Sequence, residues 1–234
     1  MKVIMLAAGI GTRLRPLTNN VPKCLFKIGR DETVIGRMVK MVKKHTEAQI
    51  YIVTGFMRDK VESSLSGVTF IFNPFFRITN SIVSLWFAQE HLDDDVIIIN
   101  ADVVIEEAIL VKFMKCEDVV MMDSSKISSA DYKVATYNDR VVMMSKELSK
   151  YAGEYAGMSK LSKKSAGQLR SKISEMIGND QVDEWYENAL VNMIIDNDFI
   201  LNVCDVAQLR WVELDRVDDL PVAHEINDGD RLDG

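Results

Sequence analysis

The stretch that decides the fold spans residues 2–25 and has the sequence KVIMLAAGIGTRLRPLTNNVPKCL. Its short apolar start, Val3–Leu6, predicts a strand, which leads into small residues that include two glycines. Small residues let backbone N–H groups approach a phosphate chain closely, because no Cβ intrudes and positive φ is accessible. Arg13 and Lys23 then supply cations for phosphate oxygens. The stretch therefore predicts a loop that holds a triphosphate.

This loop differs from the two common glycine-rich phosphate loops. It lacks G-x-x-x-x-G-K-[ST], because Lys23 lies far beyond Gly11 and follows a proline. It also lacks G-x-G-x-x-G with an acidic residue at the end of the next strand. We expect nucleotide contacts from the following loop residues: Leu6, Ala7, Ala8, Gly9, Gly11, Thr12 and Arg13.

The composition suits one folded domain with a sizeable core, since 47% of the 234 residues are hydrophobic and 27% are charged. The net charge of −7 argues against a general nucleic-acid binder. Three widely spaced cysteines without a C-x-x-C predict neither a disulfide framework nor a zinc site, and they favour the reducing cytoplasm. No segment reaches the ~18 apolar residues of a membrane span, so we expect no membrane partner.

The first half of the chain alternates apolar strands with amphipathic helices. The expected strands are Val3–Leu6, Ile50–Val53, Val68–Phe72 and Val96–Asn100, and the expected helices are Val34–Lys44, Lys60–Ser64 and Ser81–Glu90. Strands that are apolar almost throughout predict a Rossmann-like α/β fold, with a mostly parallel sheet covered by helices on both faces. Ligands of such sheets bind at the carboxyl ends of the strands. Gly55 and Ala101 fall at these ends, and we expect both to contact the nucleotide.

The second half follows a different pattern. Tyr132–Thr136 and Val141–Ser145 flank four turn-forming residues and predict a β-hairpin. Further expected elements are strands at Tyr155–Lys160, Asn202–Ala207 and Arg210–Glu213, and helices at Ser162–Ile177 and Asp183–Ile195. We expect one domain over residues 1–234, with a nucleotide-binding half (1–120), an acceptor-binding lobe on the same sheet (121–210), and a return strand with a C-terminal helix (211–234).

Two carboxylates stand at the ends of expected strands. Asp102 follows the fourth strand, and Asp215 ends the segment Trp211–Asp215. Mg²⁺ held by one or two carboxylates neutralises the charge of a bound polyphosphate, such as the triphosphate that the loop after Leu6 is expected to hold. Asp102 and Asp215 are therefore the expected magnesium ligands. Glu213, which strand alternation places in line with Asp215, is the alternative partner.

Residues 2–25 resemble, nearly residue for residue, the signature of nucleotidyltransferases that join a nucleoside triphosphate to a phosphorylated small molecule. In that family the loop and its arginine hold the phosphates, and the lysine of the Pro-Lys pair contacts phosphate in the transition state. The resemblance implies catalytic roles for Arg13 and Lys23. It also implies Mg²⁺ as the cofactor, held by Asp102 and by Asp215 in a late V-E-L-D segment.

Residues 72–90 indicate a branch of this family. Sugar-1-phosphate thymidylyl- and uridylyltransferases typically have a Pro-x-Gly-Leu-type segment here, which this chain lacks. Its Asn-Pro-Phe and Asn-Ser-x-x-Ser-Leu pattern is similar to the choline-phosphate cytidylyltransferase branch and to relatives that act on inositol phosphate or aminoethylphosphonate. This similarity implies CTP as the nucleotide, with Asn80 and Ser81 placed to contact the base. The alternative is that both residues only cap the helix that begins near Ser81.

The acceptor-binding lobe offers two lysines and one cluster of aromatic and acidic residues. Relatives carry a phosphate-contacting lysine near Lys146, which implies a catalytic role there, and Lys133 is the second candidate. Aromatic rings and acids together can enclose an ammonium group by cation–π contact and charge pairing. We therefore expect acceptor contacts from Asp183, Trp185, Tyr186 and Glu187. The same residues equally fit an amphipathic helix that packs its rings on the lobe.

These observations predict Mg²⁺-dependent transfer of a cytidylyl group from CTP to a small phospho or phosphono acceptor, such as phosphocholine or 2-aminoethylphosphonate, with release of pyrophosphate. One alternative is a sugar-1-phosphate or inositol-1-phosphate nucleotidyltransferase that uses CTP, UTP, dTTP or GTP. A remote alternative is a non-catalytic nucleotide-sensing subunit, against which the presence of Arg13, Lys23, Asp102 and Asp215 argues. The sequence leaves open the identity of the acceptor and whether the chain forms a homodimer.

Overall fold

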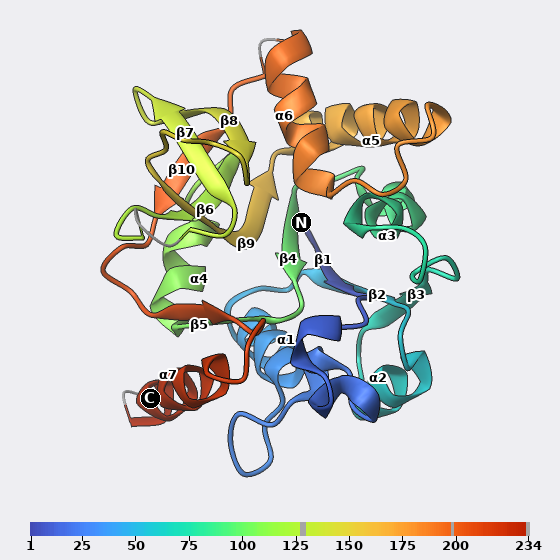
Figure 1. Cartoon of the computed structure of the whole chain (residues 1–234), viewed down its shortest axis with the longest axis vertical. Helices are drawn as coiled ribbons and strands as arrows, with labels where there is room; N and C mark the ends of the chain where they lie inside the picture. Colours follow the sequence, from blue (N-terminus) through green and yellow to red (C-terminus); the bar gives the residue numbers. More distant parts are fainter. Residues whose placement is uncertain (127–129, 198, 233–234) are drawn as a thin grey trace.

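The computed structural model describes residues 1–126, 130–197 and 199–232. A nine-stranded sheet with helices on both faces forms its centre, in the order β3-β2-β1-β4-β9-β6-β10-β8-β7 (Figure 1). Its strands are β1 (Lys2–Ala7), β2 (Gln49–Thr54), β3 (Thr69–Phe72), β4 (Val96–Asn100), β6 (Val119–Asp123), β7 (Lys133–Tyr137), β8 (Arg140–Ser145), β9 (Gly153–Leu161) and β10 (Asn202–Asp205). Two short strands, β5 (Val103–Ile105) and β11 (Trp211–Glu213), form a separate antiparallel pair. The predicted α/β class is confirmed.

The helices cover both faces of the sheet. They are α1 (Val34–His45), α2 (Arg58–Ser64), α3 (Ser81–Phe87), α4 (Glu107–Met114), α5 (Lys163–Gly178), α6 (Tyr186–Asn197) and α7 (Asp219–Leu232). Side chains of α3, α5 and α6 share one apolar cluster with the sheet, those of α1, α2 and α4 share a second, and α7 packs on the β5–β11 pair. None of these described helices has the apolar length that a membrane crossing requires.

The first half of the chain supplies the parallel part of the sheet. Its four strands, β3, β2, β1 and β4, all run in one direction. In this register, Leu6 of β1 pairs with Val53 of β2 and with Asn100 of β4. Helices cover both faces of these strands, which explains why their sequences are apolar almost without interruption. The loops that follow β1, β2 and β4 consequently leave the sheet at one edge, where the sequence predicts the ligand.

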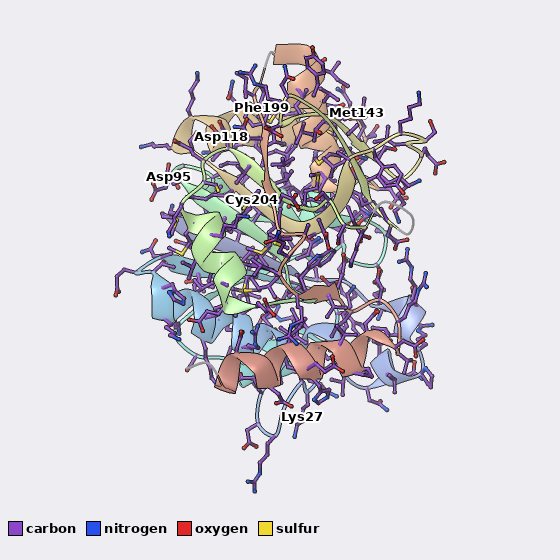
Figure 2. All side chains as sticks on the ribbon, turned by 90° about the vertical axis from the view of Figure 1, so that its left-hand side faces the viewer. Lys27, Asp95, Asp118, Met143, Phe199 and Cys204 are labelled. Carbon is purple, nitrogen blue, oxygen red and sulfur yellow. The ribbon has the colours of Figure 1, made fainter. Side chains whose placement is uncertain are left out.

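The second half of the chain adds antiparallel pairs to the predicted, mostly parallel sheet. β9 runs antiparallel between β4 and β6, and the expected β7–β8 hairpin turns at Asn138 and Asp139, both with positive φ. β7 also pairs with β9, so that β9, β6, β10, β8 and β7 close into a ring. Figure 2 shows this end with Asp118 and Phe199, far from Lys27 beyond α7.

The structure differs from the sequence-based elements at three further places. The last strand, β11, pairs with β5 and not with the large sheet, and the stretch with β5, α4 and β6 has no regular element in the prediction. Helix α6 begins at Tyr186 and not at Asp183. The backbone before it is bonded to α3, since the Asn80 N–H donates to the Val182 carbonyl (3.0 Å) and the Ile82 N–H to the Glu184 carbonyl (3.2 Å).

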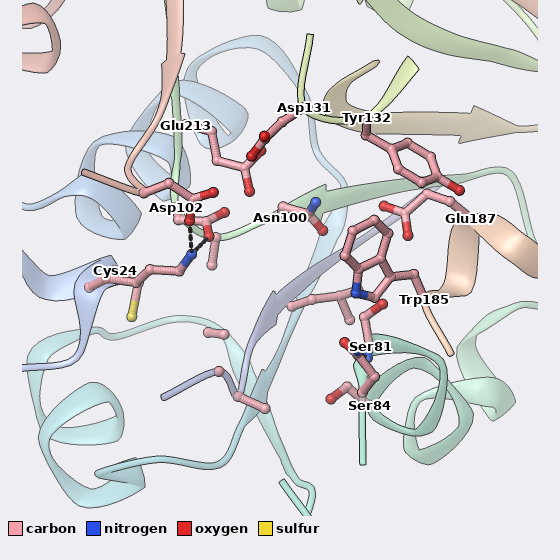
Figure 3. A pocket seen from close by; sticks show the side chains of 18 of the residues that line it. Cys24, Ser81, Ser84, Asn100, Asp102, Asp131, Tyr132, Trp185, Glu187 and Glu213 are labelled. Atoms are coloured by element: carbon pink, nitrogen blue, oxygen red, sulfur yellow. Dashed lines mark hydrogen bonds and ion pairs between the residues drawn. The ribbon is translucent and has the colours of Figure 1, made fainter. Parts of the chain in front are cut away.

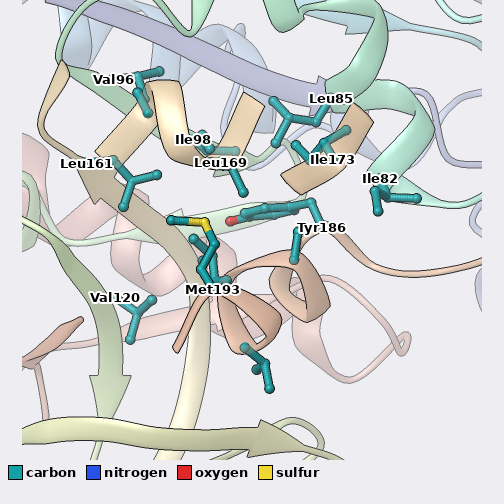
Figure 4. Packing of buried hydrophobic residues seen from close by; sticks show 14 of the residues in the cluster. Ile82, Leu85, Val96, Ile98, Val120, Leu161, Leu169, Ile173, Tyr186 and Met193 are labelled. Carbon is teal, nitrogen blue, oxygen red and sulfur yellow. The ribbon is translucent and has the colours of Figure 1, made fainter. Parts of the chain in front are cut away.

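Tyr186, expected at the acceptor, lies in the core. Its ring is fully buried among apolar side chains of α3, α5 and α6 (Figure 4). Its hydroxyl meets the hydroxyl of Tyr155 at 2.5 Å and that of Ser159 at 3.1 Å, so its polar atom is satisfied inside the protein. The alternative interpretation, a packing helix, therefore describes Tyr186 correctly.

Candidate active site

A cavity of about 300 Å³ opens at the carboxyl-terminal edge of β1 and β4. It brings together most of the residues predicted to form the site, namely Leu6, Ala7, Ala8, Gly9, Arg13, Lys23, Asn80, Ser81, Ala101, Asp102, Lys146, Trp185, Glu187 and Asp215. Figure 3 shows Asp102 and Glu213 on one side of this cavity and Tyr132, Trp185 and Glu187 on the other. The expected nucleotide and acceptor residues thus share one space.

Six predicted residues do not line this cavity: Gly11, Thr12, Gly55, Lys133, Asp183 and Tyr186. Gly11 has a φ of 67°, and its carbonyl accepts a hydrogen bond from the Thr18 hydroxyl at 2.8 Å. Gly11 therefore fixes the backbone conformation of the loop. Gly55 supports the loop as well, because a Cβ there would lie 2.8 Å from the Ala8 carbonyl oxygen. Both glycines therefore position the loop without facing the cavity.

A compact group of charges occupies the end of the cavity beside the loop. Arg13 Nη1 lies 2.8 Å from Asp215 Oδ2, and Lys23 Nζ lies 3.4 Å from Asp215 Oδ1. Lys23 also forms an ion pair with Asp102 Oδ2. The two predicted phosphate-binding cations thus pair with the two predicted metal-binding carboxylates. We call Arg13, Lys23, Asp102 and Asp215 the ion-pair quartet.

Burial sets the electrostatics around this quartet. Burial lowers the pKa of Lys23, but the carboxylates of Asp102, Glu213 and Asp215 outweigh it and raise that pKa above its usual range. Burial, together with the neighbouring charge of Asp102, raises the pKa of Glu213 to about 8. Lys23 is therefore a permanent cation. Glu213, which the sequence analysis gave as the alternative metal ligand, also lines the cavity.

The carboxylates of the quartet fit Mg²⁺. Within the described part of the chain, Asp102 Oδ1 is buried without a hydrogen-bond partner, and Asp102 lines the cavity. The described residues contain no ready-made cluster of three or more acidic, histidine or cysteine ligands. Mg²⁺ commonly takes only one or two protein carboxylates and completes its shell with substrate phosphates and water. Asp102 and Asp215 meet that requirement.

The other end of the cavity is formed by the lobe. Trp185 and Tyr132 meet edge to face with ring centroids 5.0 Å apart, and Lys146 Nζ lies 4.1 Å from the Trp185 ring centroid. Glu187 is only 4% exposed, and burial raises its pKa to about 7. Lys133 points elsewhere and donates to the Lys146 carbonyl at 2.8 Å. This end therefore offers rings, one acid and one cation.

The segment that carries Trp185 into the cavity is fixed to α3. Besides the two backbone bonds described above, the Tyr186 N–H donates to the Ser81 hydroxyl at 3.0 Å. Ser81 is therefore occupied in part by a structural contact. The Asn80 side-chain oxygen accepts from the Ser81 N–H at 2.8 Å, which leaves its amide N–H groups as donors beside the loop.

Asn100, Asp131, Tyr132 and Glu154 line the cavity without having been singled out from the sequence. Glu154 accepts from the Asp131 N–H at 2.8 Å, and the Tyr132 hydroxyl donates to Asn188 at 2.9 Å. Asn100 is the last residue of β4, close in sequence to Asp102. A polar residue at the carboxyl end of a parallel strand is itself a sign of a ligand contact, so the sequence could have indicated Asn100. The other three follow from the pairing of β7 with β9, which no local pattern announces.

Comparison with known proteins gives a consistent picture. A family model described as "Nucleotidyl transferase" matches residues 2–127. A choline-phosphate cytidylyltransferase of Streptococcus pneumoniae is 33% identical over 100 residues, which cover 42% of this chain and 43% of that protein. A CTP:phosphoglutamine cytidylyltransferase of Campylobacter jejuni is 23% identical over 257 residues, which cover 96% of this chain and 100% of that protein. The match to the first of these relatives thus spans less than half of its length.

Solved structures match over nearly the whole chain. The CTP:phosphocholine cytidylyltransferase of Streptococcus pneumoniae superposes with a TM-score of 0.80 at 23% identity and covers 97% of this chain and 98% of its own. The inositol-1-phosphate CTP transferase of T. maritima gives a TM-score of 0.79 at 19% identity, covering 97% and 94%. At these identities the likeness establishes the fold, including the mixed sheet.

Proposed function

Because this chain belongs to the nucleotidyl transferase family, we propose that it transfers the cytidylyl group of CTP to a small phosphorylated or phosphonylated acceptor. An acceptor oxygen forms a bond to the α-phosphorus, the bond from that phosphorus to the β-phosphate oxygen breaks, and pyrophosphate leaves with the electron pair. The observation that carries the proposal is the ion-pair quartet, which places two cations and two carboxylates where the loop after β1 meets the end of β4.

We assign the phosphates of CTP to the loop after β1 and to Arg13. Lys23 is only partly exposed and always charged, so it is placed to neutralise the charge that develops as pyrophosphate departs. Mg²⁺, when bound, would be held by Asp102 and Asp215 and would supply further neutralisation. Metal binding there would require the quartet to open, because the same carboxylates pair with Arg13 and Lys23.

The preference for CTP rests on Asn80 and on the relatives that use CTP. Cytosine presents acceptors at O2 and N3, and the amide N–H groups of Asn80 are donors at the cavity wall. The relatives named as cytidylyltransferases act on phosphocholine and phosphoglutamine. A further relative, from Streptomyces rubellomurinus, is named CMP-5'-(3-aminopropyl)phosphonate synthase and is 25% identical over 132 residues.

For the acceptor we favour a molecule with a phosphate or phosphonate at one end and an ammonium group at the other. Lys146 is placed to contact the phosphate or phosphonate. The ring of Trp185 and the buried carboxyl of Glu187 suit a cation, since rings and acids both attract positive charge at short range. A polyol phosphate lacks the cation that the ring and the carboxyl would attract.

The test is pyrophosphate release from a panel of nucleotides and acceptors. CTP, UTP, dTTP and GTP are each combined with phosphocholine, 2-aminoethylphosphonate, inositol 1-phosphate and glucose 1-phosphate in the presence of Mg²⁺. We expect release only with CTP and one of the two cationic acceptors. Release with glucose 1-phosphate and another nucleotide would replace this proposal with a sugar-1-phosphate nucleotidyltransferase.

A further inference from the structure

Lys146 is neutralised differently from the other two cations of the cavity. Arg13 and Lys23 pair with carboxylates, whereas no carboxylate among the described residues forms an ion pair with Lys146. Its ammonium lies 4.1 Å from the centroid of the Trp185 ring instead. The face of the Trp185 ring is the feature that would suit a cationic ligand. The ammonium group of Lys146 already covers that face.

The two residues also form a partition. A second hollow of about 320 Å³ lies beside the cavity, and Lys146, Trp185, Tyr132 and Asn80 line both spaces. The Lys146–Trp185 pair therefore stands between them. A ligand cation that approaches this ring face meets the charge of Lys146 first, and two ammonium groups cannot share one face without strong repulsion.

The backbone of Lys146 is fixed while its side chain can turn. Its carbonyl accepts from Lys133 Nζ at 2.8 Å, and the Glu147 N–H donates to the Ser145 hydroxyl at 3.1 Å. The four-carbon stem beyond this anchor has several rotamers of similar energy. The ammonium can therefore leave the ring without a change in the fold.

We propose that Lys146 occupies the place of the acceptor's ammonium group and yields it only to an acceptor that also carries a phosphate or phosphonate. The anion draws Lys146 off the ring by a charge-assisted contact, and the acceptor's own cation takes the freed face. This inference rests on the proposed cytidylyl transfer to a zwitterionic acceptor. Its consequence is a selection for both charges in one molecule, so that a free amino alcohol is refused.

Two ligands without nucleotide test the exchange. Tetramethylammonium, a cation without phosphate, is titrated by ligand-detected NMR, and phosphocholine is titrated by calorimetry. For Lys146→Met we expect opposite shifts: about tenfold tighter binding of tetramethylammonium, because the ring face is free, and about tenfold weaker binding of phosphocholine. The double variant Lys146→Met/Trp185→Ala should lose the gain for tetramethylammonium.

The matched control is Lys150→Met, which removes the same charge from an exposed position four residues away. It should bind both ligands as the wild type does. Equal affinity of wild type and Lys146→Met for tetramethylammonium would overturn the exchange, and so would a loss of affinity for both ligands together with a lower melting temperature. Because neither titration contains nucleotide, opposite shifts without pyrophosphate release in the panel would contradict the transferase reaction alone.

Discussion

The two ends of the cavity hold their cations in different ways. At the nucleotide end, Lys23 forms an ion pair with Asp102, and Arg13 lies 2.8 Å from Asp215. At the acceptor end, the charge of Lys146 lies over an aromatic ring. Under the proposed function, the first arrangement would open when phosphate replaces the carboxylates and a metal binds them. The second would open when one ligand supplies both an anion for Lys146 and a cation for the ring. The proposal thus predicts that the nucleotide end selects for magnesium and triphosphate together, and that the acceptor end selects for a phosphate and a cation in one molecule.

The largest effect should come from breaking the nucleotide end. Lys23→Ala removes the lysine cation of the quartet, and we expect kcat to fall by ~10²-fold or more, because the lost contact is strongest as pyrophosphate departs. Steady-state kinetics with CTP measure this. Lys27→Ala, at an exposed position, serves as the control. Near-normal turnover of a folded Lys23→Ala protein would exclude Lys23 from the mechanism.

Breaking the acceptor end should leave the nucleotide end intact. A desolvated cation–π contact is worth ~2 kcal/mol, or roughly thirtyfold in affinity. Trp185→Ala should therefore raise KM for the acceptor by about that factor while KM for CTP barely moves. If KM rises equally for both substrates and the melting temperature falls, the ring serves packing and the contrast between the two ends disappears.

The coupling of metal and triphosphate sharpens the comparison. Both ligands require the ion pairs of the quartet to break, so the first ligand to bind already meets that free-energy cost. Each ligand should therefore bind better when the other is present. We expect Mg²⁺ to strengthen CTP binding by about tenfold or more in calorimetry, and CTP to do the same for Mg²⁺. Asp215→Asn should reduce this coupling. Additive binding of the two ligands in the wild type would show that the quartet does not need to open.

The smallest effect concerns Glu187 and pH. Burial raises its pKa from an ordinary 4.5 to about 7, so between these values the folded protein binds more protons than the unfolded one. The free energy of unfolding should therefore fall as pH rises from 4.5 to 7, by at most about 1.4 kcal/mol per pH unit from this group. Glu187→Gln should flatten that slope and the exposed control Glu90→Gln should not, as denaturant melts at several pH values would show. An unchanged slope in Glu187→Gln would contradict the assignment.

The parallel half of the fold could be predicted from the sequence, because its strands are marked by local patterns of residues. Val3–Leu6 and Val96–Asn100 are apolar runs between loop residues, and both form strands within a residue or two of the predicted ends. The strand β5 was missed, and the predicted strand that became β11 was not expected to pair with it, because a three-residue strand has little local signal and exists only through its distant partner. The antiparallel course of β9 is likewise a matter of pairing and not of composition.

The same distinction governs the site. Arg13, Lys23, Asp102 and Asp215 belong to short motifs at strand ends, and the structure brings them into mutual contact. At the start of α6 the local pattern was insufficient. Trp185 lies just before the first residue of the helix and reaches the cavity, whereas Tyr186 begins the helix and turns into the core. The bonds between α3 and residues 182–186 decide that orientation, and they join segments about a hundred residues apart.

Those bonds to α3 have a consequence for how acceptor preference can change over evolution or in the laboratory. Because Val182, Glu184 and Tyr186 are each tied to the first turn of α3, an insertion or deletion between them would break the register with that turn. The side chains between these anchor points are free of that restriction. New acceptors should therefore be gained by exchanging residues at a constant segment length, which makes position 185 a suitable site for saturation libraries and makes loop grafting the less promising strategy.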